Sequence, residues 1–251
     1  MISHQLRAWL TLAWLDIRGR YRRTMFGPWW IVLTSGLMIG ALAFVYSEIF
    51  KIPLREFLPF VALGIVIWNL ISAVLVESTG VFTTNKYLFQ NMQIKPEWVL
   101  ARMLARNGII FLHNAIVVVV LFAVLGHAPS WTEVALGFTG LMVLCGFITG
   151  VATIMAFLGA RYRDLSQLVN AILPGAFLVT PVLWSESVLG NRRFIAEVNP
   201  LTHFVALVRE PFLGHAASTL NWVVSLGLTV IALGVAARVA TSYRRRLIFW
   251  L

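Results

Sequence analysis

Charge, cysteine and lysine are all scarce in this sequence. Only 12% of its 251 residues are charged, whereas soluble domains carry about 25%. Its single cysteine, Cys145, excludes an intrachain disulfide and a cysteine-rich metal cluster. The low charge argues against a water-soluble fold of this size.

The motifs of several enzyme classes are also missing. None of the three lysines, Lys51, Lys86 and Lys95, follows a glycine, so the chain lacks the G-x-x-x-x-G-K-[ST] loop that cradles nucleotide phosphates. It has neither a G-x-S-x-G nucleophile elbow nor His, Cys, Asp and Glu at metal-ligand spacing. We therefore expect no catalytic residue, no metal site and no cofactor site in this chain.

Long apolar runs dominate what the sequence does contain. Hydrophobic residues make up 59% of the chain, and its mean hydropathy is +0.84. A helix needs about 20 mainly apolar residues to cross a hydrocarbon core about 30 Å thick. The runs predict an all-α polytopic membrane protein with six transmembrane helices, the fifth bent or broken by Pro174 and Pro181. They lie near residues 29–50, 58–77, 106–126, 133–158, 167–184 and 220–240.

Basic residues are unevenly distributed between the predicted loops. Lysine and arginine outnumber aspartate and glutamate by 20 to 10. With the N-terminus inside, 15 of the basic residues fall on cytoplasmic segments, and the other side holds only Lys51, Arg55, Arg192, Arg193 and Arg209. Because cytoplasmic loops of membrane proteins are enriched in positive charge, both termini are predicted to be cytoplasmic. The basic surplus then needs no nucleic-acid partner.

Two cytoplasmic segments have a recognisable character. Residues 1–25 place apolar and basic positions on opposite sides of a helix, which predicts an amphipathic helix in the membrane interface. Residues 78–103 form the largest predicted cytoplasmic loop. Within it we expect a short helix from Asn85 to Asn91 and a new helix starting at Pro96.

On the outer side, residues 185–219 form one substantial segment. Asn199 and Pro200 have the order of an N-cap and a first helical residue. The helix that follows is half-polar and should kink or end at Pro211. It is too short to span, so we expect it to be re-entrant or to lie flat in the interface.

Several polar and aromatic side chains have two readings each. Asn69, His113 and Asn114 lie deep in apolar runs, where they either contact a polar substrate or make hydrogen bonds between helices. The four N-terminal arginines either anchor the interface helix or hold a lipid phosphate. The aromatic residues near the outer ends either stack on sugars or form an aromatic belt. The arginines are Arg18, Arg20, Arg22 and Arg23, and the candidate substrate path comprises Tyr46, Asn69, Phe177, Trp184, His203 and Arg209.

Four blocks of sequence carry a recognisable pattern: DIRGRYRRTMFGPWW from Asp16, NKYLFQNMQIKP from Asn85, RYRDLSQLVNAILPGAFLVTPVLW from Arg161 and NPLTHFVALVR from Asn199. Together they resemble ABC-2 permeases, and most closely their polysaccharide-export branch, the Wzm-like subunits for O-antigen, capsule and teichoic acid. The likeness covers nearly the whole chain. Lys95 departs from the family pattern, in which a phenylalanine often precedes the proline of the second block.

The resemblance implies a homodimer bound to two copies of a separate ATPase, which would carry the ATP and Mg²⁺. The complex would export an undecaprenyl-pyrophosphate-linked glycan across the bacterial inner membrane. The short helix of the long loop would be the coupling helix, and its apolar side chains are expected to face the ATPase instead of water. The implied coupling residues are Asn85, Tyr87, Leu88, Phe89 and Met92. Arg20 and Arg22 would bind the lipid pyrophosphate.

Two other functions remain open from the sequence. One is an ABC-2 exporter of a drug or small lipid, with the same dimer and motor. The other is a membrane enzyme acting on lipid-linked sugars, which needs convergent acidic and basic groups at one membrane face. The only partial candidate for such a cluster is Glu186 with Glu197, His203 and Glu210.

Overall fold

The computed structural model describes residues 11–19, 24–92 and 94–251, and every regular element among these residues is a helix. Residues 11–19 are helical. The long helices are α2 (Trp29–Phe50), α3 (Leu54–Thr84), α5 (Pro96–Leu125), α6 (Trp131–Arg161) and α10 (Thr219–Tyr243). The shorter ones are α4 (Lys86–Met92), α7 (Leu165–Val179), the 3-10 helix η1 (Glu186–Arg192), α8 (Phe194–Val198), α9 (Pro200–Phe212) and α11 (Leu247–Trp250).

Five helices in the described residues, α2, α3, α5, α6 and α10, are long and apolar enough to cross a membrane. The fifth predicted run, residues 167–184, differs from expectation. Its helix α7 has 15 residues and ends at Val179, a length of about 22 Å against a hydrocarbon core of about 30 Å. The chain continues through Thr180, Pro181, Val182 and Leu183, which are buried. Pro181 therefore lies beyond the helix, and only Pro174 lies within it.

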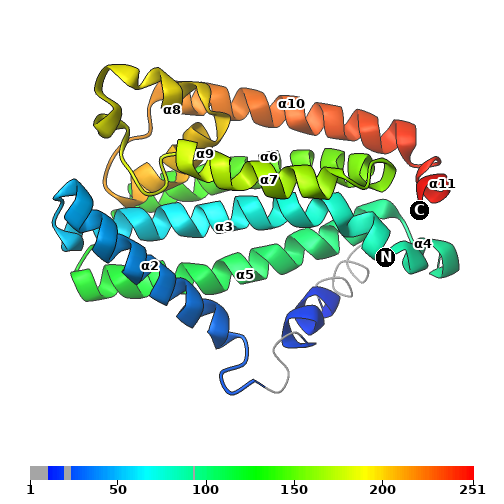
Figure 1. Ribbon diagram of the computed structural model, residues 1–251, viewed down its shortest axis with the longest axis horizontal. Coiled ribbons are helices and arrows are strands. Elements are labelled where there is room, and N and C mark those ends of the chain that lie inside the picture. The colour runs from blue at the N-terminus through cyan, green and yellow to red at the C-terminus, as the bar shows by residue number, and fades with distance from the viewer. Residues whose placement is uncertain (1–10, 20–23, 93) are drawn as a thin grey trace.

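The long helices run side by side along the length of the molecule, and α2 crosses them obliquely (Figure 1). α3 is the central helix, since 67% of its most apolar window is buried, whereas the other four long helices reach only 22 to 33%. One end of the bundle carries α4 and α11, and the opposite end carries α8 (Figure 1). We call these the α4 end and the α8 end.

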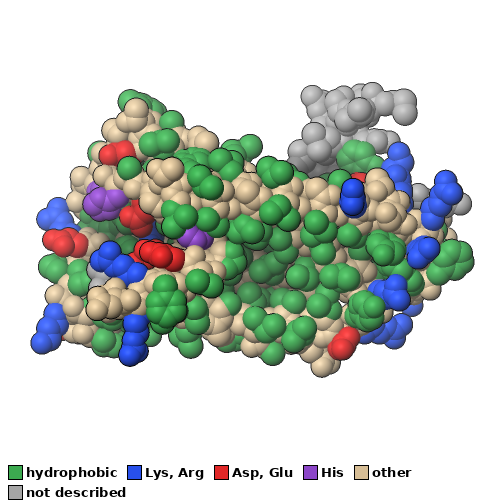
Figure 2. Space-filling view, turned by 90° about the horizontal axis from the view of Figure 1, so that it is seen from above, with side chains coloured by type: hydrophobic (Ala, Val, Ile, Leu, Met, Phe, Trp, Pro, Cys, Tyr) green, Lys and Arg blue, Asp and Glu red, His purple; other side chains and the backbone are tan. Residues whose placement is uncertain are grey.

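Charge and hydrophobicity are separated along the same axis. Charged side chains gather toward the two ends of the face drawn in Figure 2, with hydrophobic and uncharged groups between them. The exposed middle of the bundle carries large apolar side chains, including Leu37, Met142 and Val230, each at least 69% exposed. Apolar surface of this extent is typical of contact with lipid. The chain is a polytopic helical membrane protein.

Glycines on α6 allow its neighbours to pack closely. A side chain on Gly140 would collide with the Leu207 backbone of α9, and one on Gly159 would collide with the Thr79 backbone of α3. At Gly150 an added Cβ would lie 2.7 Å from the backbone carbon of Ala232 in α10. Small residues permit such close helix contacts in membranes, so α6 joins α3, α9 and α10 into one unit.

The predicted helix starts are confirmed. Pro96 begins α5. Pro200 begins α9, and the Leu201 N–H donates to the side-chain oxygen of Asn199 at 3.0 Å. α9 ends at Phe212, one residue after Pro211. These helix ends are set by prolines and by an N-cap side chain within the same few residues, which is why the sequence could locate them.

Candidate functional site

α4 connects α3 to α5 at the α4 end, and its Leu88 and Phe89 side chains do not face outward as the sequence suggested. Leu88 is 7% exposed and Phe89 5%. The Phe89 ring packs edge-on against Phe82 of α3 at 5.6 Å, and Phe82 packs against Phe157 of α6 at 5.1 Å. The expectation that Leu88 and Phe89 present apolar surface to a partner is therefore wrong, because they belong to the core.

The outward face of α4 is polar with one aromatic residue. Tyr87 is 52% exposed, and Lys86, Gln90 and Asn91 are exposed beside it. Asn85 ends α3, where its side-chain N–H donates to the Val81 carbonyl at 2.8 Å. Met92 is the last residue of α4. A partner that docks on α4 would contact Tyr87 and the polar groups around it.

Of the four N-terminal arginines, only Arg18 lies within the described residues, and it is exposed. Arg20, Arg22 and Arg23 lie outside them. On the described part of the helix, Ala13 and Ile17 are buried and Thr11 is exposed, as the amphipathic pattern predicts. The Trp14 ring stacks on His113 of α5, with ring centroids 6.4 Å apart. Residues 11–19 therefore lie against α5.

His203 and Arg209 are buried inside the bundle and do not line an open path in this chain. His203 is 2% exposed. One ring nitrogen lies 2.8 Å from the side-chain oxygen of Asn221, and the other lies 2.8 Å from the backbone oxygen of Glu197. Since both nitrogens are engaged, His203 joins α9 to α10 and to the end of α8. The partial catalytic cluster with Glu186, Glu197 and Glu210 gains no accessible base from it.

Arg209 holds three segments together. It is 3% exposed and donates to the Pro181 carbonyl at 2.6 Å and to the Glu210 carboxylate at 3.1 and 3.2 Å. Its guanidinium lies 3.9 Å from the centre of the Phe60 ring of α3, a cation–π contact. Burial lowers the pKa of Arg209, and the Glu210 carboxylate opposes that shift. Arg209 thus ties α9 to α3 and to the chain after α7.

The other candidate path residues do not all meet. Asn69 and Phe177 line one cavity of about 320 Å³ between α3 and α7, where Phe177 packs against Trp68 at 5.4 Å. Tyr46 packs on Phe50 within α2, at 5.8 Å. The Trp184 indole N–H donates to the Leu178 carbonyl at 3.0 Å. The structure therefore brings together Asn69 and Phe177 only.

A second cavity between α3 and α5 has polar side chains at mid-length. Its volume is about 400 Å³, and Asn69, Asn107 and Asn114 line it together with Ser72. Asn114 also accepts a hydrogen bond from Ser35 of α2 at 2.6 Å. Asn114 therefore makes a hydrogen bond between helices, which is one of the two roles considered from the sequence. Asn69 borders both this cavity and the one between α3 and α7.

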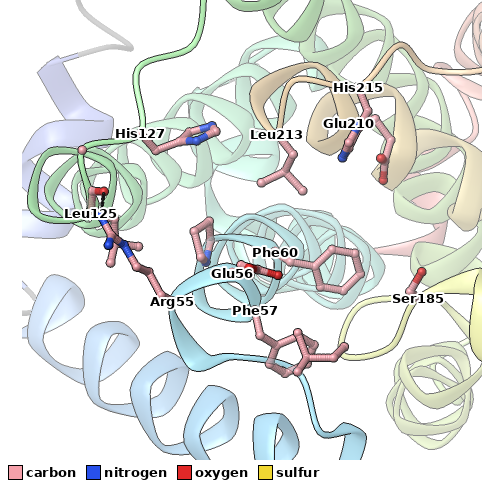
Figure 3. Close-up of a pocket in the computed structure, with 13 residues that line it drawn as sticks. Arg55, Glu56, Phe57, Phe60, Leu125, His127, Ser185, Glu210, Leu213 and His215 are labelled. Atoms are coloured by element: carbon pink, nitrogen blue, oxygen red, sulfur yellow. Dashed lines mark hydrogen bonds between the residues drawn. The ribbon is translucent and has the colours of Figure 1, made fainter.

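The largest cavity described lies at the α8 end and was not foreseen from the sequence. It has a volume of about 870 Å³. Figure 3 shows Arg55, Glu56, His127 and Glu210 on different sides of the hollow. Arg55 donates to the Leu125 carbonyl at 3.0 Å. These donors and acceptors suit a hydrated polar solute better than a lipid tail. They come from three separate segments, the start of α3, the end of α5 with the turn after it, and the end of α9, so no sequence spacing marks them.

Among the described residues, no three His, Cys, Asp or Glu side chains are placed to hold a metal ion. The site is therefore a set of surfaces and cavities in a helical bundle: a polar face on α4, a docked N-terminal helix, cavities along α3 and a polar hollow at the α8 end.

Comparison with known proteins identifies the family. Residues 7–213 match the ABC-2 type transporter family. A curated relative from Klebsiella pneumoniae, named O-antigen export system permease protein RfbA, is 23% identical over 228 residues, which cover 88% of this chain and 87% of the relative. A protein of the same name from Myxococcus xanthus is 22% identical over 243 residues, covering 94% and 92%. With most of its length matched by the family, this chain belongs to the ABC-2 type transporters.

Proposed function

We propose that this chain is the transmembrane subunit of an ABC exporter that moves a lipid-linked polysaccharide, such as O-antigen on undecaprenyl pyrophosphate, outward across the bacterial inner membrane. One observation carries the proposal: two relatives that align with nearly the whole chain are both named O-antigen export permeases. The polar cavities along a lipid-facing bundle agree with a hydrophilic cargo.

A separate ATPase supplies the energy and binds the ATP and Mg²⁺. The absence of a phosphate loop from the sequence supports an outside motor. Two copies of the chain form a homodimer, because six spans are too few to enclose a sugar polymer, and each copy carries one ATPase. The docking surface is the exposed face of α4 around Tyr87 and Lys86, with Leu88 and Phe89 fixing α4 to the bundle from behind.

The chain is one transmembrane domain that crosses the membrane six times. α7 and the buried residues 180–183 together make the fifth crossing along the chain, and α10 makes the sixth. The α4 end is cytoplasmic, as are both termini, which fits the concentration of basic residues in the segments at that end. The N-terminal helix lies in the cytoplasmic interface, residues 78–103 couple to the ATPase, and residues 185–219 face the outer side. A reporter fused after Arg246 that proved extracytoplasmic would contradict this topology.

The cargo enters beside the N-terminal helix, where Arg18, Arg20, Arg22 and Arg23 attract its pyrophosphate. Asn69 and Phe177 border its route along α3 and α7. The hollow at the α8 end receives hydrated sugar on the outer side.

Deletion of the chain in its host tests the function. We expect lipid-linked polysaccharide to remain on the cytoplasmic face, where antibody reaches it only after the inner membrane is opened, and we expect a P-loop ATPase to co-purify with the tagged chain in equal copies. Surface polysaccharide at normal levels, with altered sensitivity to a drug or an altered lipid composition, would favour the small-molecule exporter. A chemical change in the lipid-linked sugar itself would favour the membrane enzyme.

A further inference from the structure

Four charged side chains meet where residues 11–19, α3 and α5 come together. Arg102 of α5 donates to both carboxylate oxygens of Asp16, at 2.8 Å from Nε and 2.5 Å from Nη2. Arg106, one turn further along α5, donates to Asp16 at 3.1 Å and is also paired with Glu77 of α3. Asn107 donates to the other oxygen of Glu77 at 2.8 Å. A single carboxylate thus occupies two guanidinium groups.

The geometry is that of an anion held by an arginine fork. Two parallel N–H groups of one guanidinium bind two oxygens of one acid, the arrangement by which arginine also binds phosphate. The Asp16 carboxylate comes from a separate segment of chain and stands where an external anion would stand. The Arg102, Arg106 and Asp16 side chains are 19 to 22% exposed, so water and a solvated anion can reach the pair.

A cavity adjoins this pair. Its volume is about 310 Å³, room for about ten water molecules. Arg102, Arg106 and Glu77 line it together with Thr84, Asn85 and Ser166. A neighbouring cavity of about 430 Å³ shares Gly80 and Ser166 with it and adds Lys86 and Arg163. Basic side chains therefore outnumber acidic ones around this space.

The depth of the cluster suits a lipid head group. Glu77 lies at the end of the apolar run of residues 58–77 in α3, and Arg106 lies at the start of the run 106–126 in α5. The ends of apolar runs mark the boundary between the hydrocarbon core and the head groups. The cluster therefore lies at the level where lipid phosphates lie.

We infer that Arg102 and Arg106 form a binding site for a phosphoryl group carried on a lipid, and that Asp16 occupies this site in the present structure. A lipid-borne phosphate displaces the Asp16 carboxylate and releases residues 11–19 from α5. A pyrophosphate brings more negative charge and more oxygens to the two guanidinium groups than one carboxylate can, so it competes effectively at close range. That the phosphate is the cargo's pyrophosphate rests on the proposed function.

Binding to the purified full-length chain tests the site. The probes are geranylgeranyl pyrophosphate, phosphatidylglycerol and, as the uncharged control, geranylgeraniol, each titrated in detergent by microscale thermophoresis. Asp16→Asn removes the competing charge at nearly constant shape, so we expect it to tighten pyrophosphate binding by roughly fivefold or more, because a larger fraction of the site is free. Arg102→Gln and Arg106→Gln should each weaken it by about tenfold or more. Arg245→Gln, an exposed arginine near the C-terminus, should leave it unchanged.

The gain expected from Asp16→Asn keeps the test independent of folding, since a misfolded variant would not bind more tightly. Unchanged or weaker binding in Asp16→Asn, or unchanged binding in both arginine variants, would overturn the inference. Preference for the prenyl pyrophosphate assigns the site to the cargo, and equal binding of phosphatidylglycerol assigns it to a membrane lipid; both outcomes support a phosphoryl site. If this binding test fails while deletion of the chain still blocks polysaccharide export, the phosphoryl site is refuted and the proposed function is not.

A spin label reports the release directly. Leu12→Cys, at an exposed position, is labelled in a Cys145→Ser background. We expect its mobility to rise when geranylgeranyl pyrophosphate is added to the otherwise wild-type chain, and to be high without probe in Asp16→Asn. A label that stays immobile in both would refute the displacement step.

Discussion

Replacing Arg209 with methionine separates a structural role for this residue from a role in the cargo path. Arg209 is 3% exposed and satisfies the Pro181 carbonyl at 2.6 Å and the Glu210 carboxylate. Arg209→Met keeps an unbranched apolar side chain but removes the guanidinium, which leaves both oxygens without their partner. Breaking a buried ion pair on one side costs about 3 to 5 kcal/mol.

The expected loss is measurable in detergent. For a domain of 150 to 250 residues, 1 kcal/mol shifts the melting temperature by about 2 to 4 °C, so Arg209→Met should lower the midpoint by at least about 6 °C in a fluorescence-detected thermal unfolding assay. Arg209→Lys retains the positive charge but loses the planar guanidinium, so its melting midpoint should lie between those of the unaltered protein and Arg209→Met. Arg193→Met, at an exposed position of the same end, is the matched control and should not shift the midpoint. Adding Glu210→Gln to Arg209→Met should recover part of the loss, since it removes the unpaired charge.

The reasoning is refuted if Arg209→Met melts like the unaltered protein yet abolishes export. In that case Arg209 would contact the cargo, as the sequence suggested, and the buried clamp would be of no energetic consequence.

Three further predictions follow from the packing and the surfaces. Gly159→Ala should sharply reduce the yield of folded protein in size-exclusion chromatography, because its Cβ meets the Thr79 backbone, whereas Gly175→Ala, with open space around it, should not. Tyr87→Ala should reduce the amount of co-purified ATPase without lowering the melting temperature, and equal recovery of ATPase would count against the α4 surface. Leu88→Ala should lower the melting temperature by creating a cavity worth about 2 to 5 kcal/mol, and a midpoint equal to that of Tyr87→Ala would contradict its burial.

The sequence predicted the existence of the long helices better than how far some of them extend beyond their apolar runs. Apolar runs located all five long helices. The bounds of α2, α6 and α10 agree within a few residues, whereas α3 and α5 extend about one to three turns past their runs. Glu77 and Arg106 mark the ends of those runs in the sequence, yet both lie inside helices because they neutralise each other across α3 and α5. Pairing between residues 29 positions apart is invisible to a count of apolar residues.

The side chains of the candidate site were the hardest part to foresee. The pattern of α4 showed apolar residues in a loop but not their partners. Phe89 is buried because its ring packs edge-on against Phe82, which in turn packs edge-on against Phe157 of α6. The half-polar pattern of α9 correctly predicted a helix that does not span. It did not predict that its polar face is buried, because that depends on Phe60, Pro181 and Asn221, which come from three other segments.

Reconstitution tests the central claim most directly. The chain and its co-purified ATPase are placed in proteoliposomes with a fluorescent polysaccharide on undecaprenyl pyrophosphate, and the fraction of label protected from an added glycosidase is followed after ATP addition. The account predicts ATP-dependent movement of the polymer, lost when the ATPase carries a defective phosphate loop. Polymer that does not move under ATP, in vesicles where the same complex transports a small lipid or drug, would contradict it.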